Sequence, residues 1–460
     1  MNQLYALPRP RSSKPHPVWV VCLLLLAGAW HGAAAQTVNA GGGYIRDFRG
    51  AYHIDSFPVR VKGMVSRIDR RFGLTKVCIS VVHPHVSDLK IELLSPDGTS
   101  IWLTNRNGGE RGVNYVNTCF RANGFSGYIH QAKPPFESAE YSPDGRMEFL
   151  NNGQNPNGTW YVLIQDLQSG QSGQLNDISL TFGDNPTPGY AQSPCTFENG
   201  ASCRCADGNP ACALLPDLIV VPAFTTNQLL EYPENDPVYP GQLRFAVSIG
   251  NIGDGPLETL GKNEWYCGTS RVRDSSVVCP SGKLARQRLY QRIYQKNGSA
   301  LTHSDRPAGT NYYDAQPGHD HVHVDDWVAF RLVKTGRTKT GKPTRTVVST
   351  GRKVSFCLFD SGICNSEDSL CTRNGVVYGQ QNLANYGLGN YTDCKSARQG
   401  ISVGGYDTYG MRYEGQFINL PKKLPAGVYQ LEIEIDPLGL YQDKDRANNL
   451  FSTPVTLYKQ

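Results

Sequence analysis

Residues 89–105 read LKIELLSPDGTSIWLTN, and this stretch decides the fold class of the first half of the chain. Two short apolar runs flank Pro96-Asp97-Gly98, a tripeptide typical of a tight turn. Similar short runs recur on both sides as KVCISVVHPH, GTWYVLIQD and DISLTFG. Long helical periodicity is nearly absent, while Gly (48) and Pro (29) are frequent. The sequence therefore predicts an antiparallel β-sandwich or barrel.

Residues 1–35 have the order of a secretory signal peptide. A basic start is followed by an apolar run over 18–29 and by Ala33-Ala34-Ala35, a small-residue cleavage site. The alternative is a membrane anchor, but the apolar run is shorter than a spanning helix needs. No later stretch is long and apolar enough to span a membrane, so we expect a secreted, extracellular protein with no membrane span in its mature chain.

The charge and the cysteines fit export. The formal charge of +5 includes Arg9, Arg11 and Lys14 of the leader, so only +2 would remain, too little to indicate nucleic acid as a partner. Of the 13 cysteines, Cys22 leaves with the leader. The remaining even number predicts disulfides in an oxidising compartment.

A length of 460 residues indicates two or three domains. We expect a first β-sandwich over 36–190, a cysteine-rich linker over 191–214 and a second β-rich domain over 215–460. The linker holds Cys195, Cys203, Cys205 and Cys212, which favour local disulfides over a small zinc site because their spacing matches no common zinc pattern.

Three histidines stand at alternate positions in His319-Asp320-His321-Val322-His323. On a strand, alternate residues face the same side, so the three imidazoles can point together. Imidazole suits copper, zinc, iron and nickel, and spacing alone does not choose among them. The alternatives are a polar strand or a nonspecific histidine tract.

Two further motifs follow in order, Lys353-Val354-Ser355-Phe356-Cys357-Leu358 and Tyr406-Asp407-Thr408-Tyr409-Gly410. Together with the three histidines they resemble the lysyl oxidase catalytic domain over roughly residues 215–460. The resemblance implies copper held by His319, His321 and His323. It also implies a lysine tyrosylquinone cofactor made from Lys353 and Tyr409, with Tyr406 as the reserve choice.

The resemblance implies oxidative deamination of primary amines or of lysine side chains in secreted proteins. Molecular oxygen would be consumed, and an aldehyde, hydrogen peroxide and ammonia released. A base must take the α-proton of the amine. Asp325 and Asp326 are the nearest carboxylates after the histidines, and Asp326 is nominated. The animal enzymes have a further histidine beyond this segment, and this chain does not.

The lysyl oxidase resemblance also implies a calcium site and local disulfides. The residues that match the calcium site are Asp217, Leu218, Asp443, Asp445, Asn448 and Asn449. Oxygen-rich ligands suit calcium, and the alternative is a polar turn. Cys357 and Cys364 match a family disulfide, and Cys371 is expected to pair with Cys394. Cys267 and Cys279 form another local loop.

Residues 44–183 resemble the P domain found beside proprotein convertases, through SDLKIELLSPDGTSIWL, NPNGTWYVLIQD and GQLNDISLTFG. The resemblance implies a jelly-roll-like sandwich, in which Cys78 and Cys119 are expected to pair. Its role is either a spacer or a binding module, and no subtilisin-type catalytic domain accompanies it.

The chain is thus predicted to be all-β, with a P-domain-like sandwich before a lysyl-oxidase-type catalytic domain with long loops. The leading interpretation is a secreted copper- and quinone-dependent amine oxidase, with calcium as a further ligand. The alternatives are a secreted binding or matrix protein with an inactive oxidase-like domain and another His-ligated metalloenzyme, such as a zinc hydrolase.

Overall fold

A computed structural model describes residues 35–50, 53–109, 112–187, 195–315, 321–351, 355–367, 369–394 and 397–458. Almost all of the predicted signal peptide, residues 1–34, lies outside them. The prediction of an all-β chain is confirmed, since the described helices are short and α1 spans only Pro222–Asn227. Among the described residues, no helix combines the length and the apolar character needed to cross a membrane.

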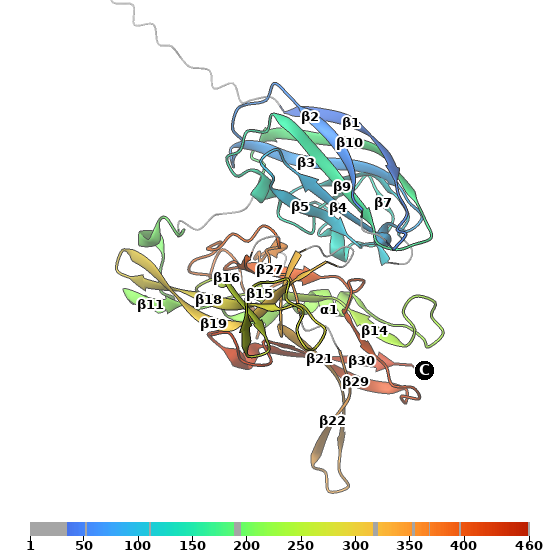
Figure 1. The fold of residues 1–460 in the computed structure, drawn as a ribbon, viewed down its shortest axis with the longest axis vertical. Coiled ribbons are helices and arrows are strands. Elements are labelled where there is room, and N and C mark those ends of the chain that lie inside the picture. Colours follow the sequence, from blue (N-terminus) through green and yellow to red (C-terminus); the bar gives the residue numbers. More distant parts are fainter. Residues whose placement is uncertain are drawn as a thin grey trace, which may run out of the picture.

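The first unit is a sandwich of two mainly antiparallel sheets (Figure 1). Its strands are β1 (Gln36–Ile45), β2 (Asp55–Val61), β3 (Phe72–Val82), β4 (Leu89–Leu94), β5 (Ser100–Asn105), β6 (Tyr115–Phe120), β7 (Phe136–Glu137), β8 (Glu140–Tyr141), β9 (Gly158–Asp166) and β10 (Gly173–Asp184). One sheet has the order β1-β10-β3-β6-β7, with β8 also on β6, and the other has the order β2-β9-β4-β5. Residues 89–105 therefore form the β4–β5 hairpin.

Strand alternation explains why these residues form a sandwich. Along β2, Phe57, Val59 and Val61 are buried, and the residues between them are exposed. Opposite them on β9, Trp160 is fully buried and packs edge-on against Phe182, with ring centroids 5.8 Å apart. Burial of these inward faces supplies the hydrophobic stabilisation of the unit.

The second unit contains several smaller sheets. Its strands are β11 (Ala211–Leu214), β12 (Leu218–Val220), β13 (Leu229–Glu231), β14 (Gln242–Phe245), β15 (Val247–Asn251), β16 (Leu257–Cys267), β17 (Ser270–Val272), β18 (Arg286–Asn297), β19 (Ala300–Asp314), β20 (His321–Val324), β21 (Val328–Arg337), β22 (Pro343–Thr350), β23 (Gly362–Ile363), β24 (Thr372–Arg373), β25 (Val376–Val377), β26 (Arg398–Ile401), β27 (Gly405–Tyr409), β28 (Phe417–Asn419), β29 (Gly427–Ile435) and β30 (Leu450–Leu457). The largest sheet has the order β17-β16-β18-β19-β20, with β11 on β18 and β26 on β16. The others run β12-β15-β27-β23, β13-β14-β28, β22-β21-β29-β30 and β24-β25.

Two strands of this unit carry the residues singled out by the sequence. β20 lies at one end of the largest sheet, paired with β19 through Asp314↔His321 and Tyr312↔His323. β27 lies between β15 and β23 and is buried along its whole length. An isolated bridge between Val324 and Phe356 holds the segment after residue 354 against β20. That segment therefore connects the two strands.

Six disulfides cross-link the described chain. They join Cys78–Cys119, Cys195–Cys203, Cys205–Cys212, Cys267–Cys279, Cys357–Cys394 and Cys364–Cys371. The expected Cys78–Cys119 and Cys267–Cys279 bridges and the local pairing of the linker cysteines are confirmed.

The expected pairs Cys357–Cys364 and Cys371–Cys394 are wrong. Cys357 follows the bridge to β20, and the backbone N–H of Val322 on β20 donates to the Cys394 carbonyl, so Cys357 and Cys394 meet across this strand. Cys364 instead closes a short loop to Cys371. Tertiary contacts on β20, not distance along the chain, decide the pairing.

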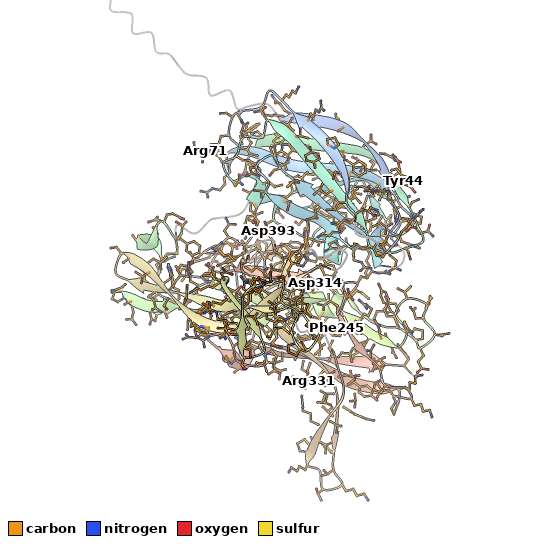
Figure 2. All side chains as sticks on the ribbon, viewed as in Figure 1. Tyr44, Arg71, Phe245, Asp314, Arg331 and Asp393 are labelled. Carbon is orange, nitrogen blue, oxygen red and sulfur yellow. A yellow bond between two sulfur atoms is a disulfide. The ribbon has the colours of Figure 1, made fainter. Side chains whose placement is uncertain are left out.

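The first sandwich lies against the second unit with its β4–β5 end facing it (Figure 1). The far end of the second unit carries the β21–β22 hairpin, which extends away from the body (Figure 1). Side chains fill the space between the units, with Asp314 and Asp393 on the side of the second unit that faces the first (Figure 2). Tyr44 lies on the outer side of the first sandwich and is 60% exposed.

Candidate active site

Two of the three predicted metal-binding histidines converge on β20. His321 and His323 are 7% and 2% exposed, and their Nε2 atoms lie 2.9 Å apart. Alternation along the strand puts both imidazoles on one side, as the spacing predicts. Two buried imidazole nitrogens that face each other at this distance either share a proton or both bind a cation. His319 lies outside the described residues.

Polar groups surround Nδ1 of His323. The Asp314 Oδ2 atom lies 3.6 Å from it, and the Tyr312 hydroxyl and Ser355 Oγ each lie 3.5 Å from it. The Tyr312 hydroxyl and Ser355 Oγ are also 2.9 Å apart, and burial raises the pKa of Tyr312. Groups of this kind fix the tautomer and the orientation of a metal-binding imidazole.

Sequence reasoning missed Asp314, Tyr312 and Ser355. Asp314 and Tyr312 alternate along the strand before the histidines, which was a usable signal. The register of β19 on β20 was needed to place them opposite His321 and His323.

Tyr409 ends β27 and is 4% exposed. Its hydroxyl donates a hydrogen bond to the Cys357 carbonyl, and its ring packs edge-on against Phe356 at 4.4 Å. Burial, followed by the charge of Asp407, raises the pKa of the Tyr409 phenol well above its usual value. Tyr409 therefore stays a neutral phenol at neutral pH, beside the segment that begins after Lys353. Lys353 itself lies outside the described residues.

Tyr406, the reserve choice, lies in a different environment. Three positions separate it from Tyr409, so the two side chains leave β27 on opposite faces. Tyr406 packs against Phe224 at 5.3 Å and against Tyr128 at 6.0 Å. Of the two tyrosines, Tyr409 is the one that contacts residues 356–357.

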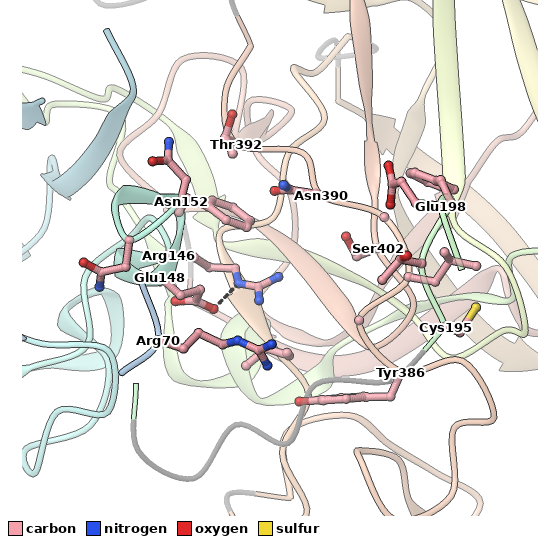
Figure 3. Close-up of a pocket in the computed structure, with 18 of the residues that line it drawn as sticks. Arg70, Arg146, Glu148, Asn152, Cys195, Glu198, Tyr386, Asn390, Thr392 and Ser402 are labelled. Carbon is pink, nitrogen blue, oxygen red and sulfur yellow. Dashed lines mark hydrogen bonds and ion pairs between the residues drawn. The ribbon is translucent and has the colours of Figure 1, made fainter. Parts of the chain in front are cut away.

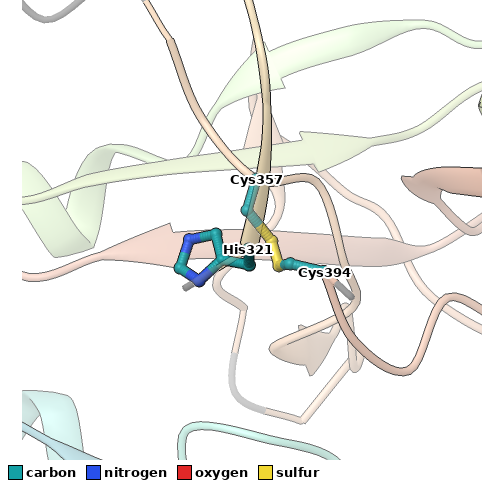
Figure 4. Close-up of side chains that lie close together, drawn as sticks. All are labelled: His321, Cys357 and Cys394. Atoms are coloured by element: carbon teal, nitrogen blue, oxygen red, sulfur yellow. A yellow bond between two sulfur atoms is a disulfide. The ribbon is translucent and has the colours of Figure 1, made fainter. Parts of the chain in front are cut away.

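The histidine pair and Tyr409 meet through one short segment. Ser355 contacts His323, and the next two residues, Phe356 and Cys357, contact Tyr409. The Cys357–Cys394 disulfide also lies beside His321, with ligand-type atoms of the three side chains within 4.8 Å of one another (Figure 4). Because both cysteines are joined in a disulfide, they do not act as thiolate ligands here.

The two carboxylates nominated as bases follow β20. Asp325 accepts from Thr310 Oγ1 at 2.8 Å and pairs with Arg286 at 3.2 Å, and burial raises its pKa. Asp326 occupies the turn that follows, with φ at 55°. The carboxylate that the structure places against a histidine is instead that of Asp314.

The six residues predicted to bind calcium gather around the start of β12 and the 3-10 helix η6 (Arg446–Asn448). The Leu218 N–H lies 3.4 Å from Asp443 Oδ2, and the Asp445 N–H donates to Asp443 Oδ1 at 3.2 Å. The Asn448 side-chain amide donates to Asp217 Oδ1.

Asn449 completes this cluster, since its side-chain amide lies 3.2 Å from both Asp443 Oδ2 and the Leu218 carbonyl. Burial raises the pKa of Asp217 and raises that of Asp443 to about 6. Two partly desolvated carboxylates among amide and carbonyl oxygens form a donor set that suits calcium.

A large cavity lies between the two units. Its volume is about 960 Å³, and its walls include Arg70, Arg146, Glu148, Tyr386 and Arg398 (Figure 3). None of the described metal-site histidines, and neither Tyr406 nor Tyr409, lines it. The cavity is therefore separate from the candidate active site.

Fold and site together define a two-domain β protein with a candidate histidine metal centre beside a buried tyrosine. Residues 74–182 match the family described as proprotein convertase P-domain, and residues 288–460 match the family described as lysyl oxidase. The chain thus carries a region that matches the P-domain family, followed by a region that matches the lysyl oxidase family.

Individual relatives agree with the second match. The chain is 31% identical over 164 residues to lysyl oxidase homolog 1 of Homo sapiens, covering 35% of this chain and 23% of that protein. It is 29% identical over 133 residues to protein-lysine 6-oxidase of Homo sapiens, covering 29% of this chain and 25% of that protein. The chain thus spans about a quarter of the length of these relatives.

Among solved structures, a serine protease of Aeromonas sobria aligns with a TM-score of 0.18 and 18% identity, covering 32% of this chain and 26% of that one. A likeness this weak carries no argument.

Proposed function

We propose that the protein is a secreted copper- and quinone-dependent amine oxidase of the lysyl oxidase type. The observation that carries the proposal is the convergence of His321, His323 and Tyr409 on residues 355–357. Similarity to lysyl oxidases over the region that contains these residues supports it. Substrates would be small primary amines or lysine side chains of secreted proteins, with oxygen as the second substrate.

The residues fit the two cofactors. His319, His321 and His323 would hold copper, for which imidazole is a suitable ligand. Tyr409 is a buried phenol beside a chain segment that begins two residues after Lys353, so Lys353 and Tyr409 are the proposed precursors of lysine tyrosylquinone. When bound, copper and the quinone supply oxidative deamination, in which a primary amine becomes an aldehyde and oxygen becomes hydrogen peroxide, with release of ammonia.

The chain's own polar groups would orient this centre. The Asp314 carboxylate and the Tyr312 and Ser355 hydroxyls hold the ring of His323 through its Nδ1 side, which leaves Nε2 facing His321. Burial of Tyr409 and its hydrogen bond to the Cys357 carbonyl fix the phenol ring in one place and exclude water from it.

The base that takes the α-proton would be a carboxylate near the histidines. Asp326 remains the proposed base because it directly follows the metal segment in the sequence. Asp314 is the competing candidate, since its carboxylate lies 3.6 Å from His323 Nδ1, whereas Asp325 pairs with Arg286. Substitution of each by asparagine distinguishes them.

Further proposals concern the rest of the chain. We propose that calcium binds at Asp217, Leu218, Asp443, Asp445, Asn448 and Asn449 and ties the start of the catalytic domain to its end. We also propose residues 36–190 as the P-domain unit, 191–214 as the linker and 215–460 as the catalytic domain. Six disulfides support export to an oxidising compartment.

The test is a peroxide-release assay on the secreted protein loaded with copper, with cadaverine and a lysine peptide as substrates. Wild type should release peroxide and show a quinone absorbance band, and Lys353→Ala should do neither. Tyr44→Ala, on the outer side of the first sandwich, is the control. A copper-loaded wild type with neither peroxide nor quinone would favour a binding protein or another metal chemistry.

A further inference from the structure

The first sandwich contacts the same segments that form the candidate oxidase centre. Trp102 on β5 is half-buried and packs edge-on against Phe359, with ring centroids 4.8 Å apart. It belongs with a small buried cluster made of Cys357, Phe359 and Cys394. Its ring centroid also lies 6.3 Å from that of His321. An aromatic side chain of the P-domain thus forms one wall beside a proposed copper ligand.

Trp102 is itself held from within the P-domain. The Lys90 ammonium on β4 lies 4.7 Å from the centre of its ring, and Lys90 is buried beside Glu92 at 3.6 Å. A cation over the indole face adds attraction to the packing on β5. The tryptophan therefore presents a fixed surface to His321.

A second contact reaches the tyrosine side of the centre. The Asn105 side chain, at the end of β5, lies within reach of the Tyr413 phenol and acts on its ionisation, as does the charge of Asp144. The Tyr413 ring packs edge-on against that of Tyr409 at 5.8 Å. Asn105 is held in turn, because its backbone N–H donates to Asp144 Oδ2 at 2.6 Å. Trp102 on β5 thus lies beside His321, and Asn105 at the end of the same strand lies next to Tyr413, which packs against Tyr409.

A third contact is an ion pair across the domain boundary. Arg146 lies 3.6 Å from Asp360, whose side chain is fully buried. Asp360 accepts from the Ser402 backbone N–H at 2.8 Å and from the Tyr391 N–H at 3.3 Å, so it holds two loops of the catalytic domain. Asp360 stands three residues after Cys357, next to the segment that joins the histidines and Tyr409.

We propose that the P-domain is a positioning part of the oxidase centre and not a detachable module. Trp102 positions His321, and Asn105, acting through Tyr413, positions Tyr409. The inference rests on the proposed function, because it concerns the copper and quinone residues named there. It predicts two separable defects, one in the copper centre and one in the quinone.

The test uses the full secreted chain with copper and four variants: Trp102→Ala, Trp102→Phe, Asn105→Leu and Tyr44→Ala. Electron paramagnetic resonance of bound Cu²⁺ reports the ligand geometry without requiring turnover. Quinone absorbance reports formation of the organic cofactor, and circular dichroism with thermal unfolding checks that each variant is folded.

Trp102→Ala should change the copper spectrum at full loading and lower the peroxide rate by about 10- to 100-fold, because small displacements of reacting groups are costly. Trp102→Phe should restore most of both, since phenylalanine keeps an aromatic wall. Asn105→Leu should leave the copper spectrum unchanged and lower the quinone yield. Tyr44→Ala should match wild type in every measurement.

The inference is overturned if Trp102→Ala and Asn105→Leu fold and match Tyr44→Ala in copper spectrum and quinone yield. A faster Trp102→Ala enzyme would also overturn it, because the P-domain would then cover the site. A wild type that binds copper but forms no quinone would contradict the proposed function alone, since the copper spectra still test the role of Trp102. A wild type that binds no copper would contradict both the proposed function and this inference.

Discussion

At the scale of single residues, a copper-binding imidazole needs a partner on its other nitrogen. Asp314 is buried and lies 3.6 Å from His323 Nδ1, so its carboxylate favours a proton on that nitrogen and leaves Nε2 directed at His321. Losing such a partner typically costs about 10- to 100-fold in metal affinity. Asp326 lies in the partly buried turn after β20 and is not one of the groups described around His323 Nδ1.

Asp314→Asn should therefore weaken copper binding by about 10- to 100-fold, measured by competition with a chelator. Asp326→Asn should leave copper affinity within about twofold of wild type. If Asp326 is the base, its substitution should lower kcat by about 100-fold or more. Equal copper affinity in Asp314→Asn and wild type would remove Asp314 from this role.

The two tyrosines of β27 provide a second test at this scale. Tyr409→Phe should abolish the quinone absorbance band, because it removes the phenol beside Cys357. Tyr406→Phe should keep the band, because Tyr406 packs on the opposite face against Phe224. A chain that loses the band only on substitution of Tyr406 would reverse the assignment.

At this scale the sequence predicted more of the site than of its surroundings. The spacing of His321 and His323 was enough to place both rings on one side of a strand. The contacts that Asp314, Ser355 and Trp102 make with the histidines could not be predicted, because they depend on how the strands and segments pair or on the contact between the two units. The spacing of residues along the chain does not predict those contacts.

At the scale of elements, the start of β12 and the helix η6 are tied together near the two ends of the second unit. Asp217 and Asp443 are both partly desolvated there, and the pKa of Asp443 is raised to about 6. Besides burial, the charge of Asp217 contributes to the raised pKa of Asp443, so the two carboxylates repel each other once both are ionised. A divalent cation between them would relieve that repulsion.

Calcium removal by EGTA should therefore lower the melting temperature by about 5–10 °C, since a ligand at about 100 times its Kd adds about 2.7 kcal/mol. Added calcium should reverse the loss. Asp443→Asn should remove the response to calcium, and Glu367→Gln, at an exposed acid, should retain it. Identical melting curves of wild type with and without EGTA would speak against a calcium site.

Element assignment from the sequence succeeded where alternation was strong, as in β9, and the disulfide prediction failed where a loop cysteine had more than one possible partner. The Cys357–Cys394 bridge is the clearest case. Its two cysteines are neighbours only because β20 lies between their segments, whereas the family pattern favoured the closer Cys364.

At the scale of the whole molecule, the contact between the two units includes a buried charge. Burial raises the pKa of Asp360, and Arg146 from the first sandwich works against that rise. Removing one partner of a buried ion pair typically costs about 3–5 kcal/mol, because the other charge is left uncompensated. Exposed pairs contribute only about 0–1 kcal/mol.

Arg146→Met should therefore destabilise the chain by about 3–5 kcal/mol at pH 8 in denaturant unfolding. Without Arg146 the pKa of Asp360 rises further. The deficit should be small at low pH, where Asp360 is protonated in both states, and should grow as pH rises and the unfolded carboxyl ionises. Arg121→Met, which removes the half-exposed pair with Glu140, is the control.

Asp360→Asn added to Arg146→Met should recover part of the loss, because it removes the fully buried carboxylate and leaves only Glu148, the other partner of Arg146, whose side chain is 12% exposed. A deficit that is the same at pH 5 and pH 8 would mean that packing of Arg146, not its charge, holds the units together.

The candidate centre forms only late in folding, because it is built from Trp102, β20, residues 355–357 and β27. These parts come from both domains and from widely separated stretches of the chain, so no partly synthesised or half-folded chain contains the centre. On the proposed function, self-oxidation of Tyr409 would begin only after the last of these strands has paired. Peroxide production would thus be delayed until the chain has been exported and has finished folding.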